Sequence, residues 1–435
     1  MKANWKYWSL KGNSLVYSLM ISMLVSTLLS AYLMADFSFR SLAERVYTEI
    51  SVQDNLRSTV ALALAHTEKF KDFSWYEEQD SAWVSFENWG GFKLSHIKAS
   101  HQHQKGQMSV LLGQKLGKNK VGLALSDEGY PLTLKGNTQL KGEVLVPKGK
   151  IYTERSNGQN FRGNIPSVEK IKPSRRLSQR DFPDIPKEIK AILDSLQALR
   201  EGYLERPALI IEEDLKQGWR EPIMKIRTRG KLYIKGGKYQ GKIMLMATES
   251  IEIGANASLE DVILIAPSIK MQNGVQGRFQ VFAGDSLLLG DDVQLQFPSM
   301  LALSAKPDRP AILEIKRRCR IEGAVLFYQA IGSSSSSNLR PQLIVGEGSA
   351  IYGTLHCAGN LSLHGVVGGM VIAKGFVLRT AVGTVRNHLL NAQLWEDRLA
   401  PAYAGPFLFD EAETAVLKIY HPGNEKVEAR GEQFD

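Results

Sequence analysis

The sequence predicts a mainly β protein: a triangular β-solenoid with an N-terminal transmembrane helix and a helical insertion. Three observations predict this fold class: an uncharged apolar run near the N-terminus, a six-residue apolar period through much of the chain, and one amphipathic segment that interrupts that period. The chain has 435 residues, of which 43% are hydrophobic, so it can bury a sizeable core. Its two cysteines exclude a disulfide scaffold and a four-cysteine zinc site.

Residues 1–35 form a basic leader and a membrane-spanning helix. Residues 12–35 carry no charge, and a helix of that length rises about 36 Å, more than the roughly 30 Å hydrocarbon core of a bilayer. We place the span at Ser14 to Ala35. Because Lys2, Lys6 and Lys11 precede it, we expect the N-terminus inside and the bulk of the chain outside a bacterial inner membrane. A cleaved signal peptide is the alternative, but its apolar region is usually only about 7–15 residues long.

The leader ends in Lys11-Gly12 and precedes a long apolar helix, and in this it resembles the start of type IV pilin-like proteins. In that family the leader is cut after the glycine, and the helix packs into a filament or an assembly platform. The resemblance therefore implies cleavage after Gly12. It departs at Tyr17, where most members have glutamate, although some minor pseudopilins also lack that acid.

Residues 36–65 are expected to form an amphipathic helix. Its apolar stripe consists of Phe39, Leu42, Val46 and Ile50. Spacings of three and four place these side chains on one helix face, which we expect to pack on the protein's own globular part rather than on a partner. Residues 66–130 are expected to form a small mixed or β region. His101 and His103 in this region could supply two metal ligands, but no third ligand is evident and an exposed loop is the simpler interpretation.

A six-residue repeat is the strongest signal. From Ile251 the chain divides into the 18-residue units IEIGANASLEDVILIAPS, IKMQNGVQGRFQVFAGDS and LLLGDDVQLQFPSMLALS. One apolar column contains Ile251, Ala257, Ile263, Ile269, Val275, Val281, Leu287 and Val293, and the other contains Ile253, Leu259, Ile265, Met271, Gly277, Ala283, Leu289 and Leu295. Residues i and i+2 of a strand point to the same side, so each six supplies two inward residues. Three such strands per coil predict a triangular solenoid with coils about 4.8 Å apart.

The same period delimits the remaining parts of the chain. Residues 131–146 are assigned to the first solenoid strands and residues 231–383 to the main solenoid. Residues 147–230 are interpreted as a basic insertion with a helix at 184–201, which lies against the solenoid flank or covers its end. Residues 384–435 are expected to be a C-terminal tail that caps the solenoid, because exposed strand edges must be covered or paired.

The insertion contains a basic cluster, which is our candidate surface for an anionic envelope polymer. Its members are Lys170, Lys172, Arg175, Arg176 and Arg180. The net charge of +9 also permits nucleic-acid binding, but no DNA- or RNA-binding fingerprint is present and we expect no nucleic acid. A solvated loop is the simpler alternative for the cluster. Both cysteines fall in inward columns and are expected to be buried, while a disulfide between Cys319 and Cys357 stays open.

The coil sequence IYGTLHCAGNLSLHGVVGGMVIA resembles bactofilins, whose triangular solenoids stack end to end into filaments. The resemblance implies a structural role. We therefore expect a membrane-anchored extracytoplasmic structural or assembly scaffold, within a pilin-like or cell-envelope assembly, without enzymatic activity, cofactor or metal. The alternatives are a bactofilin-like polymer on the cytoplasmic face and a polysaccharide-acting β-helix enzyme, whose nearest candidate acids are Asp285, Asp291 and Asp292. A hexapeptide-repeat acyltransferase is disfavoured, because residues 232–304 contain no histidine to serve as its base.

Overall fold

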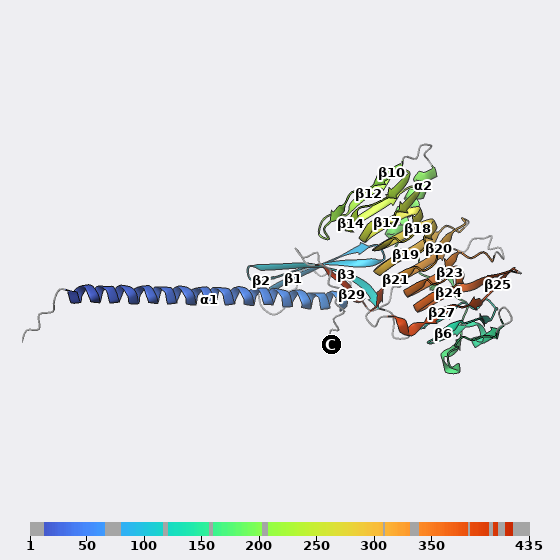
Figure 1. Ribbon diagram of the computed structural model, residues 1–435, viewed down its shortest axis with the longest axis horizontal. Coiled ribbons are helices and arrows are strands. Elements are labelled where there is room, and N and C mark those ends of the chain that lie inside the picture. The colour runs from blue at the N-terminus through green and yellow to red at the C-terminus, as the bar shows by residue number, and fades with distance from the viewer. Residues whose placement is uncertain are drawn as a thin grey trace, which may run out of the picture. The chain divides into compact units, whose positions relative to one another are not determined.

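Strands dominate the protein, as Figure 1 shows, and the mainly β class is confirmed. The computed structural model describes residues 13–65, 80–115, 121–155, 160–201, 208–307, 309–330, 339–381, 383–399, 403–407 and 414–420. The chain forms two compact units. The first contains residues 1–61, 70–84 and 97–107, and the second contains residues 62–69, 85–96 and 108–435.

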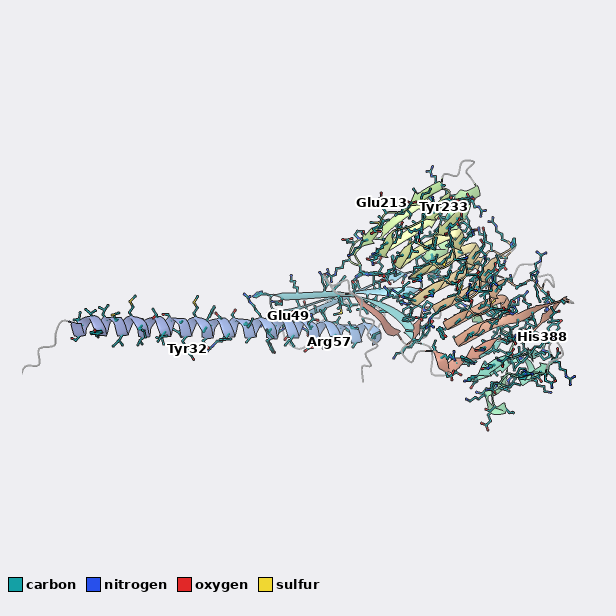
Figure 2. The ribbon with its side chains drawn as sticks, viewed as in Figure 1. Tyr32, Glu49, Arg57, Glu213, Tyr233 and His388 are labelled. Carbon is teal, nitrogen blue, oxygen red and sulfur yellow. The ribbon has the colours of Figure 1, made fainter. Side chains whose placement is uncertain are left out.

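Helix α1 (Asn13–Ala65) is continuous over 53 residues, so the expected span and the expected amphipathic helix are one element. Its apolar first half is long enough to cross a membrane. Figure 2 shows Tyr32 on that half, and Glu49 and Arg57 on the second half. At about 1.5 Å per residue the helix rises roughly 80 Å, far more than one bilayer core requires.

The second half of α1 buries a different face from the one expected. Within the first unit, Val52 and Leu56 lie against Gly106 of β3 (Gln104–Lys115), where an added Cβ would be 2.5 Å from Val52 Cγ1. The stripe of Phe39, Leu42, Val46 and Ile50 is 49–72% exposed, so our expectation that it packs on the globular part is wrong. The buried face is rotated from the stripe by about a third of a turn, at about 100° per residue.

The described part of residues 66–130 contains a small sheet, in which β1 (Asp80–Trp89), β2 (Phe92–His101) and β3 are hydrogen-bonded in that order. Two strands from the end of the chain, β28 (Ala404–Gly405) and β29 (Thr414–Tyr420), pair antiparallel with β3. Part of the expected capping tail therefore extends this sheet instead.

The second unit contains a large parallel sheet whose pairings follow three series. The first series starts with β10 (Ala208–Ile211), β13 (Lys231–Ile234), β16 (Ser250–Ile253) and the end of β17 (Ser258–Met271). The second starts with β11 (Leu215–Gln217), β14 (Lys238–Gly241) and the beginning of β17. The third starts with β12 (Met224–Thr228), β15 (Ile243–Ala247) and the middle of β17. Each turn of the chain thus adds one strand to every series.

Parallel pairing continues through long strands that contribute to more than one series. These are β18 (Gln276–Leu289), β19 (Gln294–Ala305), β21 (Arg320–Gln329), β23 (Ala350–Leu363) and β24 (Val366–Thr380). The short strands β20 (Ile312–Ile315) and β22 (Leu343–Val345) complete the first series. Figure 1 shows the strands stacked in succession from β10 towards β24.

Most of the predicted inward columns lie in one buried core, which confirms the six-residue pattern. For example, Ile251 pairs with Ile269, which pairs with Leu287, and all three side chains are fully buried. Ile263 and Ile265 are the exceptions, because they belong to a separate cluster on the outer side of the sheet. Val262, Leu264 and Ala266 take the inward places instead.

An irregularity of one residue in β17 explains why Ile263 and Ile265 were wrongly assigned to the inward columns. Asp261 adopts a left-handed conformation, with φ of 62°, and the register shifts between Glu260 and Val262. Leu264 consequently pairs with Val281, and Ile263 pairs with Gln280. Because side chains alternate along a strand, a slip of one residue exchanges its inward and outward sets.

Helix α2 (Lys187–Glu201) lies on the outer side of the third series, which confirms the predicted helix and its flanking position. Ile189, Leu193 and Leu196 share the outer cluster with Ile263 and Phe282. The strands of this series are therefore apolar on both faces, as expected where a parallel sheet is covered.

The topology corrects two of the predicted boundaries. Four early strands do not precede β13 in the strand order. They are β4 (Leu123–Leu125), β5 (Leu132–Lys135), β6 (Gln139–Lys141) and β7 (Val144–Val146). Instead β4 pairs with β24, β5 with β26 (His388–Leu390) and β6 with β27 (Gln393–Trp395). The strands of 131–146 therefore pair beside the C-terminal strands. β6 and β7 lie at the opposite end of the large sheet from β10, and β5 lies with β26 in a separate three-stranded sheet.

This arrangement also redefines the segments 147–230 and 384–435. The supposed insertion contributes β9 (Ile171–Pro173) at one end of the large sheet and β10, β11 and β12 at the other, while β8 (Ile151–Glu154) pairs with β5 in a separate three-stranded sheet. Residues 388–395 supply paired strands rather than a cap: β27 belongs to the large sheet and β26 to the three-stranded sheet. Before them, β25 (Gly383–Arg386) folds back antiparallel on β24. A periodic pattern shows which side chains point inward, but not which strands are neighbours.

Candidate functional site

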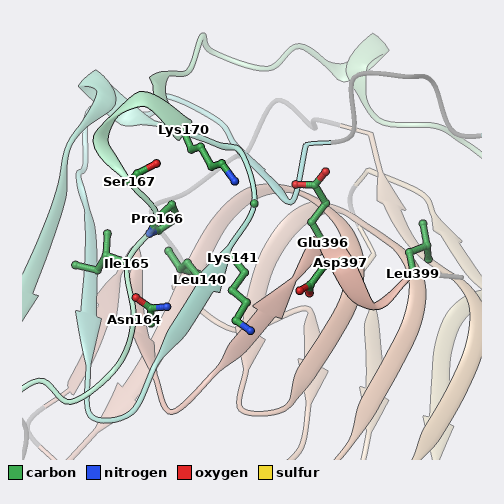
Figure 3. Close-up of a pocket in the computed structure, with 11 residues that line it drawn as sticks. Leu140, Lys141, Asn164, Ile165, Pro166, Ser167, Lys170, Glu396, Asp397 and Leu399 are labelled. Carbon is green, nitrogen blue, oxygen red and sulfur yellow. The ribbon is translucent and has the colours of Figure 1, made fainter. Parts of the chain in front are cut away.

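A pocket of about 730 Å³ with a mixed polar and apolar lining lies where β6, the residues before β9 and the turn after β27 meet. Figure 3 shows its charged and amide side chains. Those that can contact a ligand are Lys141, Asn164, Ser167, Lys170, Glu396 and Asp397. The pocket thus combines hydrogen-bonding groups of both charges with apolar side chains such as Ile165 and Leu399.

The pocket exists because two distant segments pair. Trp395 of β27 lies opposite Lys141 of β6, although they are separated by more than half of the chain. The Lys141 ammonium lies 5.4 Å from the Trp395 ring centre, and the Arg398 guanidinium lies 3.2 Å from it. Both positive groups thus make cation–π contacts with the same aromatic ring.

Glu396 is fixed by the backbone of the facing turn. Its Oε2 accepts a hydrogen bond of 3.1 Å from the backbone N–H of Glu143. Gly142 makes this approach feasible, because its φ is 98° and an added Cβ would lie 2.1 Å from Glu396 Oε2. Sequence reasoning missed Lys141, Glu396 and Asp397, since nothing in the chain signals that β27 and β6 are neighbours.

One member of the predicted basic cluster, Lys170, lies in this pocket, and carboxylates face three of the five members. Lys170 lines the pocket itself, and Lys172 Nζ lies 2.7 Å from Glu143 Oε2. Arg175 binds Asp181 through two nitrogens, and Arg176 Nη2 lies 3.6 Å from Glu128 Oε2. Hydrogen bonding by Arg175 lowers the pKa of Asp181 to about 2, so this pair stays charged across the physiological range. The cluster is therefore less positive than its sequence indicates.

A serine–histidine–glutamate arrangement occurs elsewhere in the second unit. His96 Nδ1 lies 3.0 Å from Ser109 Oγ, and His96 Nε2 lies 3.4 Å from Glu87 Oε2. Lys242 Nζ donates to the same Glu87 oxygen at 2.6 Å. Burial lowers the pKa of His96. Ser109 is only 1% exposed, so a substrate cannot reach its hydroxyl, and the group serves as a buried polar network.

The acids named for an enzymatic alternative form ion pairs. Asp285 accepts a hydrogen bond of 3.0 Å from Arg200 of α2. Asp291 Oδ2 lies 3.7 Å from Arg317, and Asp292 accepts hydrogen bonds of 2.7 and 2.8 Å from Arg318. These side chains tie neighbouring turns and α2 to the sheet.

Among the described residues, no group of three or more histidine, cysteine, aspartate or glutamate side chains is placed to hold a metal ion. His101 is buried in β2 and its Nδ1 lies 2.6 Å from Asp80 Oδ1, so the exposed-loop interpretation is wrong for this residue.

Cys319 and Cys357 are buried free thiols, so they do not form a disulfide with each other. Burial raises the pKa of Cys357 to about 12. The cleavage position after Gly12 lies outside the described residues.

His356 is expected to make stability depend on pH. It is fully buried, which lowers its pKa to about 4, whereas an unfolded histidine titrates near 6.5. The unfolded chain therefore binds this proton first, and stability is lost as pH falls from about 6.5 to about 4. Between these two pH values the free energy of unfolding, measured in urea, should fall by about 3 kcal/mol more in the wild type than in the His356→Leu variant. Identical pH dependence in the two proteins would contradict this assignment.

No protein-family model, curated protein or solved structure matches this sequence.

Proposed function

We propose that this protein is a membrane-anchored structural or assembly scaffold of the bacterial cell envelope. The observation that carries the proposal is the uncharged, exposed apolar half of α1, joined on one chain to a large unit of parallel strands. Large apolar side chains such as Leu24 and Leu28 are 60% and 63% exposed. Their transfer from water into hydrocarbon is favourable, so this half of the helix belongs in a membrane rather than in water. A role in a pilin-like assembly, with cleavage after Gly12, belongs to the same proposal.

We further propose that the parallel strands form a triangular β-solenoid. Support comes from the three series of pairings, because each turn of the chain adds one strand to each series before the next turn begins. Alternate side chains from all three series fill one common core. Electron cryomicroscopy of the full chain in detergent should show three flat walls around that core, and a two-layered or open sheet would refute the solenoid.

The proposed orientation places the N-terminus in the cytoplasm and both compact units outside the inner membrane. Lys2, Lys6 and Lys11 support it, since positive flanks are retained inside. Protease treatment of intact spheroplasts should digest the part of the chain that follows Ala35, while a cytoplasmic control protein stays intact. Protection until the membrane is lysed would refute this orientation and favour the cytoplasmic-face polymer.

One observation favours the polymer as a second candidate function. Strand β10 ends its series, and Leu209 and Ile210 there are 37% and 50% exposed. Leu209 occupies the same column as the fully buried Leu232 of β13, so its exposure reflects the end of the stack. Such an edge can pair with another chain. Negative-stain imaging of the detergent-solubilised chain separates filaments from discrete particles.

For the basic cluster we propose an anionic envelope polymer as partner. Arg175 and Arg176 support this, because their side chains remain 68% and 79% exposed despite their acidic neighbours. Binding should weaken at high salt, since exposed charges are screened. Co-sedimentation with isolated cell walls at low and high ionic strength tests the partner.

A further inference from the structure

Beyond the uncharged run, helix α1 carries large apolar side chains that no element among the described residues covers. Phe39 is 72% exposed, Leu42 59% and Val46 49%. They lie beyond the charged residue Asp36, which ends the uncharged run. The hydrocarbon core therefore does not account for their exposure, and a partner in the aqueous layer would remove these side chains from water.

These residues continue a seven-residue pattern that begins inside the span. Successive members are separated alternately by four and three residues: Leu28, Tyr32, Ala35, Phe39, Leu42 and Val46. This spacing places them in one line along the helix, as in the contact seam of two helices that wind around each other. At about 1.5 Å per residue the seam is roughly 27 Å long, and Ala35 at its middle permits close approach.

The seam ends where the helix starts to pack on its own unit. The next two positions of the pattern are Glu49 and Gln53, which are polar. From Thr48 onward the helix buries Val52 and Leu56 on a face rotated away from the seam. The helix can therefore contact its own strands and a second helix at the same time.

We propose that this seam pairs with the same seam of a second copy of this chain, in a parallel two-helix contact that begins in the membrane and extends beyond it. The proposal rests on the membrane anchoring proposed above, because two copies inserted in one direction can only run parallel. In that arrangement the flanking residues meet as Ser38 with Ala43 and Arg45 with Ile50. Within the seam no like charges face each other, and the contact ends before Glu49, where two carboxylates would otherwise meet.

Cysteine cross-linking of the full chain in membrane vesicles tests the proposal. Single cysteines are placed on the seam (Phe39→Cys, Leu42→Cys, Val46→Cys) and on the opposite face (Phe37→Cys, Glu44→Cys). Phe37 is a matched control, because it is 74% exposed and only two residues from Phe39. The native thiols Cys319 and Cys357 are buried, and the chain without added cysteine reports their background.

Oxidation with copper phenanthroline should give a product of twice the chain mass at the three seam positions, at least fivefold more than at the two control positions. Equal cross-linking on both faces, or none on the seam, overturns the proposal. Products of another mass overturn it in favour of a different partner. Protease treatment of spheroplasts reports anchoring and orientation independently, so failure of self-pairing is distinguishable from failure of the proposed function.

Discussion

Replacing Leu264 by aspartate is expected to unfold the parallel sheet, whereas the same change at its neighbour Ile263 is expected to release α2 and leave most of the sheet folded. Both side chains are fully buried. Leu264 lies in the central core, paired between Leu245 and Val281, where a new carboxylate would be surrounded by apolar side chains. An unpaired buried charge costs about 3–5 kcal/mol or more, a large part of the 5–15 kcal/mol that stabilises a typical domain.

Ile263 faces the opposite way, into the cluster under α2. A carboxylate there can reach water once the helix detaches, so the cost is limited to the contacts of the outer cluster, which α2 shares with β1, β2 and β3. Circular dichroism should show a lost β signal for Leu264→Asp and a retained one for Ile263→Asp. Trypsin should cut Ile263→Asp at Lys187 and Lys190 of α2 faster than it cuts the wild type. An exposed change on the neighbouring strand, Gln276→Asp, is the control, and equal unfolding of both core variants would contradict the register.

Gly353→Ala is expected to be nearly as damaging, although it adds one methyl group. Gly323, Gly353 and Gly369 lie opposite one another on β21, β23 and β24. An added Cβ at Gly353, whose φ is 154°, would lie 1.7 Å from the Gly323 carbonyl oxygen. Backbone cannot yield there without breaking the sheet hydrogen bonds on both sides, so we expect a loss of more than about 4 kcal/mol.

Gly383→Ala is the matched control, because Gly383 has nearly the same φ of 155° while its Cβ would meet no described heavy atom within 4 Å. Gly383→Ala has the same unfavourable backbone conformation as Gly353→Ala, which costs about 1–3 kcal/mol, but its Cβ does not collide with a neighbouring strand. Urea unfolding of the two variants in detergent should therefore differ by at least about 2 kcal/mol. Equal stabilities would show that conformational strain, rather than the close approach of neighbouring strands, requires glycine at position 353.

Neither the candidate site nor the strand order could be predicted from the sequence, because both depend on which strands are neighbours. Lys141 and Trp395 meet because β6 pairs with β27, yet each strand carries only the same short apolar period as many others. A repeat that makes strands alike also removes the information about which of them are neighbours. The basic cluster was recognisable as a run of charges, but its carboxylate partners Glu128 and Glu143 come from elsewhere in the chain.

The sequence by itself determined the mainly β class, the apolar segment long enough to span a membrane, helix α2 and most of the inward columns, because each of these depends on local spacing of apolar side chains. The tertiary structure decided the register at Ile263, where residues 262–266 are apolar on both faces and alternation gives no preference. It also decided that Phe39, Leu42 and Val46 face away from the strands. Both outcomes depend on what covers each face, which distant segments supply and local spacing does not encode.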